Sequence, residues 1–146
     1  MKKILILSFF VLAACKTFAQ TITVNADTVL NGNIEKNCPG GFAAFNGYIK
    51  KATHYPAVAR EASIQGVCYV EFVIEPNGRV GNICTLLPCG SGIDEEVARV
   101  IKPTGNWIPA TLDGKPVRTF CRAAVKFALR MEGGEMVGVI EAKDIN

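Results

Sequence analysis

The stretch YPAVAREASIQGVCYVEFVIEPNGRV, residues 55–80, decides the fold of this chain. Its proline can occupy the first turn of a short helix, where its missing N–H costs nothing. We expect Gly66 to end that helix. From Val67 to Ile74 apolar residues alternate with a period of two, which predicts a strand. Asn77-Gly78 is a strong hairpin signal because both residues tolerate positive φ, so Arg79 to Leu87 is predicted as the return strand.

Helical and strand periodicities continue on both sides of this stretch. Before it, apolar residues at spacings of three and four predict a helix whose aromatic stripe packs in the core; they are Phe42, Phe45, Tyr48 and Ile49. After it, Ser91 followed by Asp94 resembles a capping box that starts another helix, and Pro103 stops that helix. A third strand follows in which alternate residues are apolar: Cys121, Ala123, Val125, Phe127 and Leu129.

The order helix, helix, strand, strand, helix, strand predicts an α+β fold. A helix between the second and third strands makes these two run in the same direction, so the third strand is antiparallel to the first. The simplest result is a three-stranded antiparallel sheet in the order 2-1-3, with helices packed on one face. We expect Trp107 to pack beneath this sheet. The third strand is then an edge that offers unpaired N–H and C=O groups to another chain.

The N-terminus is typical of a secretion signal, which we assign to residues 1–19. The apolar stretch Ile4 to Ala14 is shorter than the roughly 20 residues that a stable membrane anchor needs. Two processing routes remain open: cleavage after Ala19 to give a soluble periplasmic protein, or lipid attachment at Cys15 to hold the chain at a membrane face. We expect a lead-in over residues 20–38, either flexible or with a short strand at Thr21–Val24.

The domain proper is predicted over residues 39–130, and a tail over 131–146 can add a weak strand at Glu135–Ile140. The chain has 16 basic and 13 acidic residues, which gives a net charge of +3. Lys2, Lys3 and Lys16 lie in the leader, so the mature chain is close to neutral. It therefore lacks the basic surface that nucleic-acid binding requires.

Six cysteines are many for 146 residues, and behind a secretion signal they indicate disulfides. Five remain after the leader, so at least one stays free or bonds to a second copy, which leaves a homodimer open. We predict a local disulfide between Cys84 and Cys89. Cys68 and Cys121 are not expected to bond, because each opens its strand and the starts of antiparallel strands lie at opposite ends.

Nothing in the chain points to catalysis. His54 is the only histidine, which excludes a histidine-based metal cluster, and we expect it to lie at the start of a helix. The run Asp94-Glu95-Glu96 is explained by the favourable effect of acidic groups at a helix N-terminus. No phosphate-binding Gly-x-x-x-x-Gly-Lys loop occurs. We therefore expect no enzymatic activity, cofactor, metal or small-molecule substrate.

Several short motifs, taken in their order and spacing, resemble the C-terminal domain of TonB, the energy-transducing protein of Gram-negative envelopes. The resemblance covers residues 39 to 129, in the version common in Bacteroidota. The motifs are Pro39-Gly40-Gly41, Tyr55-Pro56, Ile64-Gln65-Gly66, Phe72-Val73-Ile74, Asn77-Gly78-Arg79-Val80, Asp94-Glu95-Glu96, Trp107-Ile108-Pro109 and Asp113-Gly114-Lys115-Pro116-Val117.

This resemblance implies a partner and a site. Family members grip a short extended segment, the TonB box, of outer-membrane transporters and add it to a sheet edge. By the resemblance, the gripping edge is the third strand, Thr119 to Leu129, and a second contact lies at the segment before Tyr55. The partner-binding residues it implies are Thr119, Phe120, Cys121, Arg122, Ala123, Ala124, Val125, Lys126, His54 and Tyr55.

The expected partner is therefore an outer-membrane TonB-dependent transporter or another envelope protein. Family members normally carry a membrane anchor and a proline-rich linker, and neither is recognisable in this sequence. We accordingly expect a binding or accessory role rather than full force transduction. The alternative is a secreted structural or regulatory envelope module that contacts no transporter, since a fold alone does not fix function.

Overall fold

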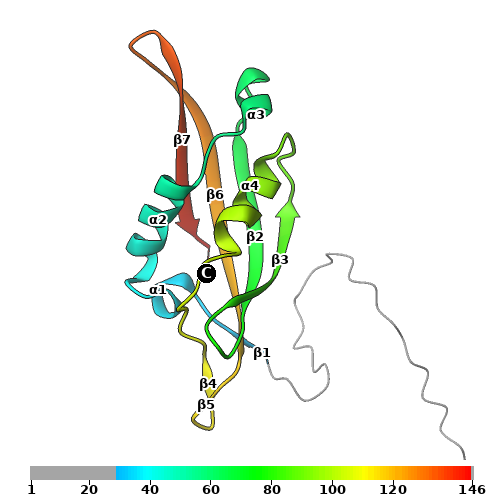
Figure 1. The fold of residues 1–146 in the computed structure, drawn as a ribbon, viewed down its shortest axis with the longest axis vertical. Coiled ribbons are helices and arrows are strands. Elements are labelled where there is room, and N and C mark those ends of the chain that lie inside the picture. The colour runs from blue at the N-terminus through cyan, green and yellow to red at the C-terminus, as the bar shows by residue number, and fades with distance from the viewer. Residues whose placement is uncertain (1–28, 146) are drawn as a thin grey trace, which may run out of the picture.

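The computed structural model describes residues 29–145, which form a sheet with helices over it (Figure 1). The predicted leader, Cys15 and the possible strand at Thr21–Val24 lie outside the described residues. The elements are β1 (Val29–Asn31), α1 (Ile34–Asn37), α2 (Gly41–Ala52), α3 (Ala57–Glu61), β2 (Gly66–Ile74), β3 (Val80–Leu87), α4 (Ile93–Ile101), β4 (Thr111–Leu112), β5 (Lys115–Pro116), β6 (Arg118–Glu132) and β7 (Glu135–Asp144).

The main sheet has five strands, with the order β1-β6-β2-β3 and β7 also paired to β6. β2 pairs antiparallel with both β3 and β6, and the helices lie on one side of the sheet (Figure 1). The predicted α+β class is confirmed. The prediction of a three-stranded sheet is wrong, because the lead-in supplies β1 and the tail supplies a ten-residue β7.

Alternation in β2 and β6 places one set of side chains in the core. Cys68, Val70, Phe72 and Ile74 of β2 are at most 1% exposed, as are the inward-facing residues of β6 from Cys121 to Phe127. Apolar burial of this kind is the main favourable term in folding. The alternation that predicted the strands is therefore the pattern that builds the core.

The helices match the expected positions but differ at their ends. α2 buries Phe45 and Ile49, as the aromatic stripe predicted. α3 ends at Glu61, and Gly66 begins β2 instead of ending the helix. The N-cap of α4 is Gly92, with a φ of 84°, and no side chain caps the helix, so the predicted capping box at Ser91 is wrong.

Asn37 connects the N-terminal segment to the crossover that precedes β4. Its Nδ2 donates to the Ile108 carbonyl at 2.6 Å, and its own carbonyl accepts from the Ile108 N–H at 2.8 Å. A Cβ atom on Gly32 would lie 2.4 Å from both Asn37 Oδ1 and Thr119 Cγ2. Only glycine fits there, so this close approach fixes where β1 meets β6.

Trp107 is buried, with 4% of its surface exposed, as the sequence predicted. Its ring makes edge contacts with Phe45 of α2 and Phe72 of β2, at centroid distances of 5.8 and 5.2 Å. The indole N–H donates to Thr104 Oγ1 at 2.9 Å, which satisfies its polar group. Trp107 therefore joins a helix to the sheet in the middle of the core.

Replacing Trp107 with alanine should lower the free energy of unfolding by about 3–5 kcal/mol, because a large buried ring is lost and leaves a cavity. Urea unfolding followed by circular dichroism measures this loss. Ile108→Ala is the matched control: its side chain is 53% exposed, so the change should stay within about 0.5 kcal/mol. Equal stability of the two variants would contradict the packing described for Trp107.

Candidate functional site

β6, the strand expected to grip a partner, has neighbours on both sides. On one side Thr119 to Phe127 pair with β2. On the other side, Arg118 to Phe120 pair with β1, and residues 123–132 pair with β7. The prediction that Thr119 to Leu129 forms an open edge is therefore wrong, because segments outside the predicted domain close it.

Most of the predicted partner-binding residues on β6 are buried. Thr119, Cys121, Ala123, Ala124 and Val125 are at most 1% exposed. Thr119 Oγ1 accepts from the Ala110 N–H at 2.7 Å and donates to the Val117 carbonyl at 3.1 Å. These side chains hold the fold together and cannot reach a partner while it is intact.

The remaining predicted residues of β6 lie on the face away from the helices. Arg122 lies opposite Glu71 of β2, and its Nε is 2.7 Å from Glu71 Oε1. Its guanidinium carbon lies 5.1 Å from the centroid of the Phe120 ring. Among the predicted residues of this strand, only Lys126 is exposed. The ion pair with Glu71 thus holds the Arg122 side chain against the sheet.

Tyr55, predicted as a second contact, is half-buried and packs against the core. Its ring meets Phe127 of β6 edge-on, at a centroid distance of 5.4 Å, and its hydroxyl donates to the Ile64 carbonyl. A Cβ on Gly138 of β7 would lie only 2.6 Å from Tyr55 Cδ2. Tyr55 therefore holds the segment before α3 against both β6 and β7.

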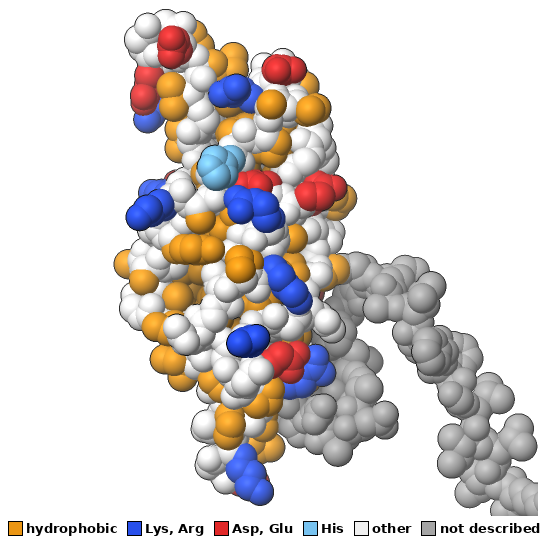
Figure 2. All heavy atoms as spheres, viewed as in Figure 1, with side chains coloured by type: hydrophobic (Ala, Val, Ile, Leu, Met, Phe, Trp, Pro, Cys, Tyr) orange, Lys and Arg blue, Asp and Glu red, His pale blue; other side chains and the backbone are white. Residues whose placement is uncertain are grey.

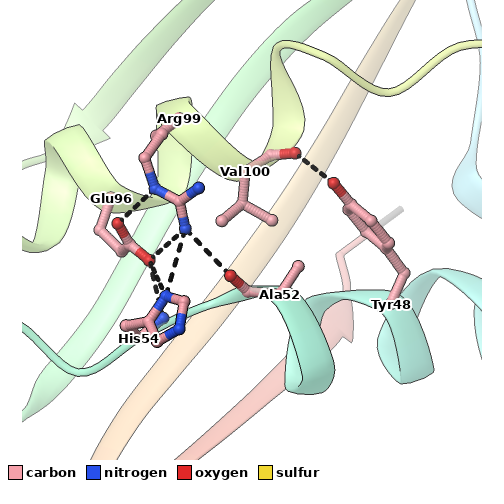
Figure 3. Close-up of polar contacts among 6 residues, drawn as sticks. All are labelled: Tyr48, Ala52, His54, Glu96, Arg99 and Val100. Carbon is pink, nitrogen blue, oxygen red and sulfur yellow. Dashed lines mark hydrogen bonds and ion pairs between the residues drawn. The ribbon is translucent and has the colours of Figure 1, made fainter.

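His54 belongs to a polar cluster that joins α4 to the end of α2 (Figure 3). Glu96 Oε1 accepts from the His54 backbone N–H and from Arg99 Nη2, both at 2.7 Å. Arg99 Nη2 also donates to the Ala52 carbonyl at 3.0 Å. The hydrogen bond from Arg99 is the main reason why the pKa of Glu96 falls to about 2.

The imidazole of His54 itself lies on the surface, with 83% of the side chain exposed (Figure 2). The backbone of this residue thus serves the fold, while its ring remains accessible. Of the ten predicted partner-binding residues, the structure leaves only His54 and Lys126 fully at the surface. They lie on different elements and do not form a site together.

The strand edge that is open lies on β7. Within residues 29–145, β7 pairs only with β6. The Ala142 N–H donates to Asn46 Oδ1 of α2 at 3.0 Å, so it points away from β6. Because the backbone groups of alternate residues point to the same side in an antiparallel pair, Met136, Gly138 and Ile140 present their N–H and C=O groups on this outer edge.

The hairpin of β6 and β7 extends beyond the rest of the sheet as an arm (Figure 1). β2 ends its pairing with β6 at Gly66 opposite Phe127, so later residues of β6 have only β7 beside them. The Leu129 N–H donates to Gln65 Oε1 at 2.8 Å on the side of β2. Met131, Met136 and Val137 on this arm are 63%, 44% and 36% exposed.

β3, at the opposite end of the sheet from β1 and β7, is a poorer edge. Its pairing with β2 is irregular at two points, between Tyr69 and Val70 and between Phe72 and Ile74. Lys102 Nζ donates to the Gly81 carbonyl on this strand. Bulges and lysines are the usual means of blocking strand addition at an edge.

Sequence reasoning underestimated β7, which was expected as a weak strand at Glu135–Ile140. A signal for it was present in the sequence. Gly133-Gly134 is a hairpin turn in which both residues have positive φ, 59° and 88°. Its length and partner depend on contacts with Tyr55 and Asn46 far away in the chain, which no local pattern reports.

The predicted Cys84–Cys89 disulfide is also wrong, because Cys89 is a free thiol. Cys84 lies opposite Glu71, on the face away from the helices, whereas Cys89 lies near Cys68 and Gly66 on the helix side. Cys68 and Cys121 are not bonded to each other, as predicted, and their strand partners are Val125 and Phe72 respectively. Among the described residues no cluster of three or more side chains could hold a metal ion.

The Glu96 cluster makes stability depend on pH. The pKa of Glu96 is about 2 in the folded chain against an ordinary value of 4.5, so its stabilising effect is present above pH 4.5 and is lost as pH falls towards 2. Glu96→Gln should lower the melting temperature at pH 6–7 and have little effect near pH 2. Glu95→Gln, on the same helix turn but exposed, is the control. A pH-independent effect of Glu96→Gln would contradict this role.

Among known proteins, the chain matches one family. A family model described as the Gram-negative bacterial TonB protein C-terminal matches residues 51–129. No curated protein and no solved structure matches the chain. The match begins in α2 and ends in β6, so β1 and β7 lie outside it. In residues 29–145, no helix has the length and apolar character to cross a membrane.

Proposed function

Because the chain belongs to the TonB C-terminal family, whose members are non-enzymatic interaction domains of the envelope, we propose that it is a periplasmic binding module that adds an extended partner segment to the outer edge of β7. The partner is an outer-membrane TonB-dependent transporter or another envelope protein. The module is either free in the periplasm or held by a lipid at a membrane face, the two outcomes that the predicted secretion signal allows.

The observation that carries this proposal is the open outer edge of β7. Main-chain hydrogen bonds give affinity when an extended peptide joins such an edge, and side chains give specificity. Asn46 Oδ1 accepts from the outward N–H of Ala142, so this position of β7 already has a hydrogen-bond partner. The positions from Met136 to Ile140 have no neighbouring strand on that side within the described residues.

The surroundings of this edge favour a particular kind of segment. Val137 and Val139 alternate with the residues that face α2, so they lie on the opposite face of β7. Val137 is 36% exposed. An added strand would lie beside these two valines, so a partner with an apolar residue at every second position suits this face. On the helix side the segment would pass Asn46 and Lys50, and Lys50 Nζ already lies 3.8 Å from Glu141 Oε1.

A second arrangement of the same function places the partner on β6 in place of β7. The family match ends at residue 129, so the matched segment includes β6 but not β7. Strand exchange at β6 requires the pairing of residues 123–132 with β7 to open first. A different function, a structural or regulatory envelope module that contacts no transporter, predicts that no transporter segment binds at all.

Replacing Met136 with proline tests addition to β7. Proline removes an N–H that points outward, while the hydrogen bonds from β7 to β6 remain. Binding of labelled peptides that carry the TonB-box segments of outer-membrane transporters, measured by fluorescence polarisation, should weaken roughly two- to tenfold, because one main-chain hydrogen bond is lost. Met136→Ala keeps the N–H and should bind like the unmodified chain. Unchanged binding by a folded Met136→Pro chain would rule out this edge.

A crosslink between β6 and β7 separates addition from exchange. Met131 and Met136 lie opposite each other, and the outward N–H of Met136 makes them a non-hydrogen-bonded pair, in which Cβ atoms are close enough for a disulfide. The oxidised double variant Met131→Cys, Met136→Cys should retain peptide binding if the partner adds to β7. Loss of binding on oxidation and recovery on reduction would show that the partner takes the place of β7. Absence of binding to the unmodified chain would favour the alternative function.

A further inference from the structure

Two free thiols, Cys68 and Cys89, lie beside one carboxylate on the helix side of the sheet. Cys68 Sγ is 3.4 Å from Asp94 Oδ1, and the same oxygen accepts from the Cys89 N–H at 3.0 Å. A Cβ on Gly66 would lie 3.2 Å from Cys89 Sγ. Gly66 and Cys68 are two positions apart in β2 and share a face, so the Cys89 sulfur lies beside Cys68.

The strand register gives the same neighbourhood independently. Leu87, the last residue of β3, lies opposite Tyr69. Cys89 comes two residues later, which brings it next to the first residues of β2.

We propose that Cys68 and Cys89 form a disulfide under oxidising conditions, which ties the loop between β3 and α4 to the start of β2. This bond differs from the Cys84–Cys89 pair that sequence spacing indicates. The proposed disulfide does not depend on the proposed partner-binding function. The two thiols lie beside Asp94, where β2 begins and β3 has just ended, and neither is part of β7.

The reaction is a thiol–disulfide exchange with an external disulfide, either a small molecule or a protein. Cys89 is the more exposed thiol, so its thiolate attacks the external disulfide, forms a mixed disulfide and releases one external thiolate. Cys68 then loses its proton to solvent and attacks the Cys89 sulfur, which releases the second external thiolate. Two protein thiols are oxidised, and the external disulfide is reduced to two thiols.

The surroundings predict a slow reaction at neutral pH. Burial and the neighbouring Asp94 raise the pKa of Cys68 to about 12, and burial raises the pKa of Cys89 as well. Since the thiolate is the attacking species, the rate should increase with pH. The second step requires Cys68 to give up its hydrogen bond to Asp94, while the Cys89 N–H can keep its own.

Peptide mapping of the full chain tests the proposal directly. Trypsin cleaves after Arg60, Arg79 and Arg99, so Cys68 falls in residues 61–79 and both Cys84 and Cys89 fall in residues 80–99. After incubation with oxidised glutathione, non-reducing mass spectrometry should find these two peptides linked. A Cys84–Cys89 bond would instead give peptide 80–99 alone, two hydrogens lighter, and would overturn the proposal.

Three variants identify the sulfur atoms involved. The crosslink should persist in Cys84→Ser and disappear in Cys89→Ser and in Cys68→Ser. Cys121, a fully buried thiol on β6, should remain reduced and is the internal control. The crosslinked chain should melt roughly 5–10 °C above the reduced chain, as expected for a loop of about 20 residues closed by a bond. A crosslink that survives in Cys89→Ser, or no linked peptides at pH 8–9, would show that these thiols do not pair.

Discussion

Two-sided pairing of β6 is the constraint on which the rest of this structure depends. A central strand has its backbone N–H and C=O groups satisfied by neighbours, so its core-facing side chains can be fully buried without an unpaired polar group. The Cys121 to Phe127 stretch meets this condition through β2 on one side and mainly β7 on the other. The strand that forms the centre of the core therefore cannot also be a free docking edge, and the open edge moves outward to β7.

Tyr55 shows how closely the body of the fold is connected to that edge. Its ring lies against Phe127 and above Gly138, where any side chain would collide with it. This places β7 against the segment that leads into α3, while Asn46 of α2 holds the same strand at Ala142. Tyr55, which the sequence suggested as a partner contact, thus helps the chain to fix its own last strand.

Local signals predicted the parts of the fold that depend on local structure. The period of two in β2, the Asn77-Gly78 turn and the stripe on α2 report short-range geometry, and each predicted element is present. β1 and β7 depend on contacts across most of the chain, such as Gly32 against Thr119, so their pairing with β6 was missed. The Cys84–Cys89 prediction failed for the same reason: β3 ends at Leu87, and the following loop places Cys89 beside Gly66 and Asp94, which neither spacing nor local pattern reports.

Energetics limit what the β7 edge can do by itself. Each main-chain hydrogen bond contributes about 0.5–1.5 kcal/mol net, whereas association costs at least about 4 kcal/mol. Within residues 29–145, Met136, Gly138 and Ile140 offer outward groups that no neighbouring strand uses, and Asn46 competes for the next one, at Ala142. Backbone pairing alone therefore supports only weak binding. The discrimination between partners must come from side chains that meet Val137 and Val139 or the α2 side, so a sequence preference at alternate positions is a physical requirement of this site.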